Sequence, residues 1–151
     1  MNTNTKIIAT VGPSCDNKEV LQSMIDSGVN TFRLNMSHGD DATKKELYSL
    51  VQAKITTDDM RAFKTQAKKM KDATKNEIGT ISYDFFINEE KREVFIVEKY
   101  EDEKAFMKHM EKLMQEEFIP KLLTMQELSS FDMLGSVTEQ IDDFFERRLG
   151  L

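Results

Sequence analysis

Apolar and polar positions alternate along three stretches in the middle of the chain, the pattern typical of β-strands. The stretches are 47–55, 79–87 and 93–100, and in the last two both alternating sets of positions contain apolar side chains. Strands that carry apolar groups on both sides are usually buried on both faces of their sheet. We therefore expect a sheet whose two faces both need a cover.

Segments with apolar residues at helical spacing separate and follow these strands. Thr56 and Thr57 are candidate caps for the first helix, whose apolar stripe comprises Met60, Phe63, Ala67, Met70 and Thr74. Asp102 is the candidate cap of the second helix, whose stripe comprises Phe106, Met110 and Leu113. A fourth strand over 125–133 completes a β-α-β-β-α-β order, the ferredoxin-like arrangement. The last predicted element is an amphipathic helix over 137–149.

The first 43 residues predict a separate unit of strand, helix and strand. A β-rich run at 6–11 ends at a Gly-Pro pair, an amphipathic helix stops near Gly28, and a second strand covers 30–34. Such βαβ units form parallel strand pairs. We expect an α+β protein with two domains, a βαβ appendage over 1–43 and a ferredoxin-like module over 44–151 that folds without it.

Two motifs in this N-terminal unit resemble pyruvate kinase. They are TKIIATVGPS and, further along, GVNTFRLNMSHGD, in the order and at the spacing of that family's first strand, helix and second strand. The resemblance implies that Arg33 contacts the phosphoenolpyruvate phosphate and that Asn35 and Ser37 bind potassium. It also implies that the stretch ending at His38 lies against the nucleotide.

This resemblance covers only residues 5–41. Within it, Met36 stands where the family usually has phenylalanine, and the residues after position 41 lack the family's D-T-K-G-P-E segment, catalytic lysine and magnesium-binding Glu/Asp pair. Phosphoryl transfer depends on positioning and electrostatic stabilisation by such groups. We expect an inert fused fragment without pyruvate kinase activity, its four ligand positions vestigial.

The second domain is similar to the antibiotic biosynthesis monooxygenase family. The matching motifs are GTISYD at 79–84, FIVEKYED at 95–102 and AFMKH at 105–109. This family contains small cofactor-independent oxygenases and relatives that pair as dimeric α/β barrels. The resemblance implies a module of the dimeric α/β-barrel type, a homodimer formed through the sheet, and a small hydrophobic or aromatic ligand.

Composition and net charge limit the classes of partner and the cellular location that we expect for the chain. The net charge of −6 argues against nucleic-acid binding, which depends on basic residues that neutralise phosphates. Cys15 is the single cysteine, no apolar run is long enough to cross a membrane, and the N-terminus is too polar for a secretory signal. A cytoplasmic protein is therefore expected. No metal-ligand spacing and no Gly-rich phosphate loop appear, so we expect no cofactor or metal.

The candidate catalytic residues are His109, Glu98 and Tyr83, with Tyr100 and Phe106 as substrate-binding residues. His109 is either an acid–base group or a satisfied histidine at the edge of the core. Glu98 lies on an otherwise buried strand, so it either orients a substrate hydroxyl or His109, or pairs with a lysine across the dimer. The tyrosines either donate hydrogen bonds in an apolar pocket or pack at the sheet rim.

The resemblance implies a cofactor-independent monooxygenase that acts on a small aromatic or quinol-type substrate, and His109 and Glu98 are the residues that would deprotonate this substrate in a desolvated pocket. The alternative is a non-catalytic ligand-binding or interaction module in which the βαβ unit is a docking arm. A pocket with His109 facing its interior would favour the enzyme, whereas a filled core there would favour the binding module.

Overall fold

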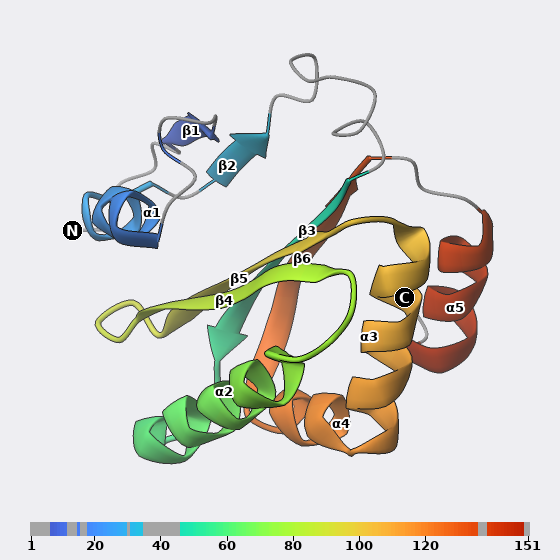
Figure 1. Cartoon of the computed structure of the whole chain (residues 1–151). Coiled ribbons are helices and arrows are strands. Elements are labelled where there is room, and N and C mark those ends of the chain that lie inside the picture. The colour runs from blue at the N-terminus through green and yellow to red at the C-terminus, as the bar shows by residue number, and fades with distance from the viewer. Residues whose placement is uncertain are drawn as a thin grey trace.

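The computed structural model describes residues 7–11, 15, 18–29, 31–34, 46–135 and 139–149, and the chain has an α+β fold (Figure 1). The strands are β1 (Ile8–Val11), β2 (Thr31–Leu34), β3 (Leu47–Ile55), β4 (Thr80–Asn88), β5 (Glu93–Tyr100) and β6 (Gln126–Leu134). The helices are α1 (Lys18–Asp26), α2 (Met60–Thr74), α3 (Glu103–Gln115), α4 (Phe118–Leu123) and α5 (Glu139–Leu149).

Strands β3 to β6 form one antiparallel sheet in the order β4-β5-β3-β6. Strands β3 and β6 lie next to each other in the sheet, although the β4–β5 hairpin comes between them in the sequence. A split β-α-β arrangement requires this. The ferredoxin-like prediction is therefore confirmed. Register across the sheet places Glu98 opposite Ser49 on β3 and opposite Tyr83 on β4, so three polar side chains share one row of one face.

The helices α2 to α5 cover the face of the sheet that carries this row, which we call the inner face (Figure 1). Asp102 caps α3 as predicted, since its carboxylate accepts a hydrogen bond of 2.9 Å from the Ala105 backbone N–H. The prediction for α2 is wrong by two residues. Asp59 is the cap of that helix and accepts from the Ala62 N–H at 2.8 Å, while the hydroxyl of Thr57 accepts from the N–H of Asp59.

The opposite, outer face of the sheet is covered by the N-terminal βαβ unit. Strands β1 and β2 pair in parallel as expected, in a two-stranded sheet of their own. Residues from both strands and from α1 form one buried cluster with the outer face of the module, comprising Val11, Leu21, Ile25, Phe32, Leu50, Phe86 and Phe95. The sequence pattern predicts a second copy of the chain on this face and a mere appendage over 1–43. Within a single chain, the N-terminal unit covers this face, and the homodimer stays a prediction.

The predicted domain boundary near residue 43 lies outside the described residues, so the division into two domains stays a prediction. Among the helices that the structure describes, none has the length and apolar character to span a bilayer. The cytoplasmic location likewise stays a prediction.

Gly79 allows β4 to start directly beneath α3. Its φ is +90°, and a Cβ atom there would lie 2.5 Å from the Cβ of Ala105. Gly28 has a similar φ of +99°, but its Cβ would meet nothing within 4 Å. A side chain would therefore bring backbone strain at both positions, but it would clash with α3 only at Gly79.

We predict that Gly79→Ala destabilises the chain more than Gly28→Ala does. Backbone strain costs about 1–3 kcal/mol at either position, and the clash with α3 adds about 1–3 kcal/mol at Gly79 alone. Urea unfolding of both variants measures the difference in the free energy of unfolding. Equal losses would mean that α3 does not approach Gly79 as closely as described.

Candidate functional site

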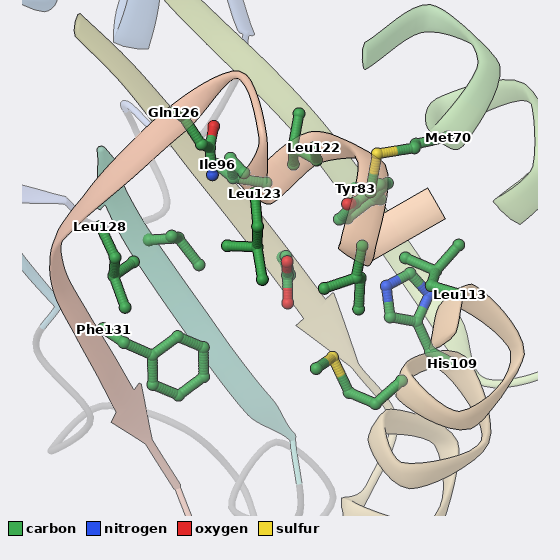
Figure 2. A pocket seen from close by; sticks show the side chains of 14 residues that line it. Met70, Tyr83, Ile96, His109, Leu113, Leu122, Leu123, Gln126, Leu128 and Phe131 are labelled. Atoms are coloured by element: carbon green, nitrogen blue, oxygen red, sulfur yellow. The ribbon is translucent and has the colours of Figure 1, made fainter. Parts of the chain in front are cut away.

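A cavity of about 220 Å³ lies between the inner face of the sheet and helices α2, α3 and α4 (Figure 2). Its wall is predominantly apolar, with Val51, Met70, Ile96, Leu113, Leu122 and Phe131 among the lining residues. Leu123 also lines it and is 46% exposed, which places the outer end of the cavity beside α4. An apolar cavity of about 150 Å³ binds benzene. This cavity is therefore large enough for a substituted aromatic ring.

His109 reaches the cavity from the buried side of α3. Its side chain has no exposed surface, and its ring packs against Tyr83 and Tyr100 with centroid distances of 4.8 and 5.3 Å. Nδ1 lies 2.7 Å from a carboxylate oxygen of Glu77, whereas Nε2 is buried without a hydrogen-bond partner. A buried ring nitrogen without a partner is costly and unusual, and a ligand in the cavity is one way to satisfy it.

Glu77 lies in the turn between α2 and β4 and is held by three donors. Besides His109, the Lys112 ammonium group donates to it at 3.1 Å and the Thr80 hydroxyl at 3.0 Å. Although burial acts to raise the pKa of Glu77, the hydrogen bond and charge of His109 and the bond from Lys112 outweigh it, so this pKa is lowered. An ionised carboxylate only accepts hydrogen bonds. The proton shared with Glu77 therefore lies on Nδ1 of His109, and Nε2 is the ring nitrogen that remains to interact with a ligand.

Glu98 is the second buried carboxylate of the site and lines the cavity. The Tyr100 hydroxyl donates to it at 3.0 Å. Burial raises the pKa of Glu98, while the nearby His109 and the hydroxyls of Tyr100 and Ser49 act in the opposite direction without cancelling it. Glu98 is thus a carboxyl group whose charge is unfavourable in its surroundings, a property common at functional sites.

Tyr83 and Gln126 complete the polar lining. Burial, reinforced by the charge of Glu98, raises the pKa of Tyr83 well above its ordinary value, so its phenol stays protonated and is available as a donor. Gln126 is buried at the start of β6, and its side-chain Oε1 has no hydrogen-bond partner. In Figure 2, Gln126 and His109 lie on opposite sides of the cavity. A ligand between them meets two unsatisfied polar atoms.

The structure brings the three candidate catalytic residues, His109, Glu98 and Tyr83, to this one cavity. The two candidate substrate-binding residues do not line it. Tyr100 and Phe106 are fully buried and pack edge to face against each other, with ring centroids 5.3 Å apart. Tyr100 acts on the site only through its bonds and packing to Glu98 and His109.

Only one of the four pyruvate-kinase-like ligand positions lies among the described residues. Arg33 is exposed on β2, whereas Asn35, Ser37 and His38 lie outside the described residues. Sequence reasoning misses two residues of the cavity site, Glu77 and Gln126. Glu77 is in a turn 32 residues before His109, so no periodic pattern connects the two. Gln126 is predicted only as part of a strand, and with Glu127 directly after it the sequence gives no signal that its amide is buried.

In the described part of the chain, no group of three or more His, Cys, Asp or Glu side chains is placed to hold a metal ion. The polar groups that line the cavity are one imidazole, one carboxyl, one phenol and one amide. The arrangement offers a base, a proton donor and two further hydrogen-bonding groups around an apolar space.

The sequence pattern of the family described as "Pyruvate kinase, barrel domain" matches residues 2–116, more than half of the chain. The chain belongs to this family. The match extends well beyond residues 5–41, to which the motifs alone confine the resemblance. From residue 47 onward, however, the matched part of this pyruvate kinase family member is an antiparallel sheet with helices on its inner face, not a series of parallel βα units.

Similarity to individual pyruvate kinases is concentrated in a short segment. The chain is 55% identical to pyruvate kinase of Buchnera aphidicola subsp. Baizongia pistaciae over 53 residues, which are 35% of this chain and 10% of that protein. It is 50% identical to pyruvate kinase 2 of Synechocystis sp. over 48 residues, which are 32% of this chain and 8% of that protein. The chain thus spans only about a tenth of the length of these relatives.

Solved structures similar to the chain have the antibiotic biosynthesis monooxygenase-like fold. A conserved protein from Methanosarcina mazei Go1 matches with a TM-score of 0.55 and 16% identity over 62% of this chain and 95% of that one. SnoaB, a cofactor-independent oxygenase from Streptomyces nogalater studied as a mutant, matches with a TM-score of 0.54 and 7% identity. The match covers 62% of this chain and 95% of that one. An antibiotic biosynthesis monooxygenase matches with a TM-score of 0.53 and 16% identity, over 61% of this chain and 99% of that one. At these identities the likeness establishes the fold.

We predict that Glu98→Gln stabilises the chain at pH 7. Because the folded pKa of Glu98 is raised, the unfolded chain loses this proton first as pH rises, so the ionised group costs stability above its ordinary pKa of 4.5. Glutamine removes the charge and keeps an oxygen that accepts from Tyr100. Urea midpoints should therefore be higher for the variant at pH 7 and equal to wild type at pH 3.

The exposed Glu90, in the β4–β5 turn, provides the matched control, and Glu90→Gln should leave the midpoint unchanged. A Glu98→Gln protein that is less stable than wild type at pH 7 would show that the carboxylate is well compensated in the folded chain.

Proposed function

We propose that the module formed by β3 to α5 is a cofactor-independent monooxygenase that acts on a small aromatic or quinol-type substrate. The observation that carries this proposal is His109, whose Nδ1 is fixed by Glu77 and whose partnerless Nε2 belongs to a ring that lines an apolar cavity. A base oriented by a carboxylate, in a site largely removed from water, is suited to deprotonate a weakly acidic hydroxyl group. The similarity in fold to SnoaB, described as a cofactor-independent oxygenase, supports the same class.

In the proposed reaction, Nε2 of His109 removes the hydroxyl proton of a quinol. The anion transfers an electron to O₂, and a ring carbon then bonds to oxygen to give a hydroperoxide. The proton held by His109 passes to the peroxide oxygen as the hydroperoxide forms. The O–O bond then breaks as the hydrogen on that ring carbon leaves as a proton, and this proton and the departing hydroxide form water. A quinol and O₂ thereby give a hydroxyquinone and one water molecule, so the substrate supplies all four electrons. The low polarity of the cavity favours the first electron transfer because a delocalised anion is poorly stabilised there.

Gln126 and Glu98 would set the orientation of the substrate. The unsatisfied Oε1 of Gln126, across the cavity from His109, is suited to accept from a second hydroxyl group. Glu98, whose pKa is raised by burial, and the protonated phenol of Tyr83 lie opposite each other on neighbouring strands and line the same cavity. A substrate with a donor at each end would satisfy both buried acceptors at once, which favours a dihydroxy ring over a monohydroxy one.

The alternative function is a non-catalytic ligand-binding or interaction module. A filled core around His109 would have favoured this alternative. The cavity beside His109 and its unpaired Nε2 instead support the enzyme, because a purely structural histidine has both ring nitrogens satisfied or exposed.

We predict that His109→Gln lowers quinol-dependent oxygen consumption by about 10²- to 10⁴-fold, the usual contribution of a general base. Glu77→Gln should lower kcat while leaving KM unchanged, because it removes the group that fixes the tautomer and orientation of the ring but no contact with substrate. Oxygen-electrode assays over a panel of hydroquinones, naphthoquinols and their dimethoxy analogues give both parameters.

Lys108→Gln, at an exposed position beside His109 on α3, is the matched control and should retain full activity. Oxygen consumption that His109→Gln leaves unchanged would refute the assignment of the base. If the panel binds to the wild-type protein, as followed by thermal shift, but no turnover occurs, the non-catalytic alternative is supported.

We also expect no pyruvate kinase turnover from this chain of 151 residues. The positions that resemble ligand-binding residues of that enzyme, Arg33, Asn35, Ser37 and His38, fall in one short segment, and the groups that would position magnesium and transfer the phosphoryl group do not come after it. A coupled assay with phosphoenolpyruvate, ADP, magnesium and potassium measures this. Activity in protein made in a host lacking its own pyruvate kinase would overturn the expectation.

A further inference from the structure

The outer face of the sheet carries an apolar patch that the rest of the module leaves uncovered. We define the patch as Leu50, Phe86, Phe95 and Val97, which come from the adjacent strands β3, β4 and β5. Phe86 and Phe95 are 1% and 2% exposed in the full chain. The helices α2 to α5 all lie on the inner face, so the burial of this patch depends on the N-terminal unit.

Both layers of the N-terminal unit, the helix α1 and the strand pair β1-β2, contact the patch. Leu21 and Ile25, one turn apart on α1, are buried in the same cluster as the patch. Phe32 of β2 packs edge to face on Phe95, with ring centroids 5.9 Å apart and an interplanar angle of 82°. Aromatic pairs of this geometry add specificity beyond the burial of apolar area. The contact is therefore a formed interface and not a loose arm lying across a surface.

A polar rim borders the patch on the same face. Lys99 pairs with Glu46 at 2.8 Å and lies over the ring of Tyr48, whose hydroxyl donates to Glu46 at 3.0 Å. The rim thus holds charges of both signs. A second copy of the chain, which carries the same rim, would therefore not be repelled by it. An apolar centre with a polar border is typical of protein–protein interfaces.

We propose that the N-terminal βαβ unit is an intramolecular cover that keeps the chain monomeric, and that a second copy of the chain binds to the patch when the cover is displaced. A patch on a sheet face can pair with itself about a two-fold axis, because each copy presents the same residues to the other. The homodimer expected from the two-sided strands is then the state of the uncovered module, and the covered chain is the monomer.

The test uses the full chain with one substitution in the cover. Ile25 is 2% exposed in the cluster, whereas Ser23 is exposed on the same helix, so Ile25→Asp and Ser23→Asp introduce the same charge at a buried and at an exposed position. Light scattering on a sizing column should give the monomer mass of 17.5 kDa for wild type and Ser23→Asp. Ile25→Asp should give twice that mass at the same micromolar concentration, or self-associate further.

A second substitution distinguishes the release of the cover from simple misfolding. Adding Phe95→Asp to Ile25→Asp places a charge in the patch itself and should return the protein to a soluble, folded monomer by mass and far-UV circular dichroism. A double variant that still self-associates would overturn the proposal, because the patch would not be the contact. A wild-type dimer, or an Ile25→Asp protein that stays monomeric, would overturn it equally.

Discussion

Strand β5 must be covered on both sides, and this requirement determines how the rest of the molecule is assembled. Val94, Phe95 and Ile96 are consecutive and all at most 3% exposed, although alternate residues of a strand point to opposite faces. The helices of the module bury Val94 and Ile96, and the N-terminal unit buries Phe95. A ferredoxin-like module supplies helices for one face only. The second cover therefore has to come from elsewhere, and here the same chain supplies it.

The inner face is covered but not completely filled, and the unfilled part holds the polar groups. Buried polar atoms without partners cost free energy, and so does a buried carboxylate. Glu77 is compensated by three donors, whereas Glu98 keeps a raised pKa and the Nε2 of His109 keeps no partner. Such uncompensated groups are retained at a cost to stability. Their convergence on one cavity is a stronger indication of function than any one of them alone.

Local patterns are sufficient to predict most elements of the module, whereas the site depends on contacts between distant residues. The alternation over 47–55 gives β3 with its observed bounds, and Asp102 caps α3 because a short acceptor side chain precedes a helical stripe. His109 is identified from its chemistry, but the residue that orients it comes from a turn with no periodic signal. Tyr100 and Phe106 fill the core behind His109, where their volume serves packing. Sequence pattern predicts which face a side chain occupies, but not whether that part of the face is filled or hollow.

The N-terminal unit illustrates how a segment with strong family similarity can serve a different structural purpose. A parallel pair of four-residue strands and one short helix bury too little area to be stable alone. In a complete βα barrel, the neighbouring strands and helices supply the missing contacts. In this chain, Leu21, Ile25 and Phe32 find an apolar sheet face instead. The apolar side of the N-terminal unit needs a cover, and so does the outer face of the sheet. Each of the two covers the other, and this packing explains how a barrel segment is held on an antiparallel fold.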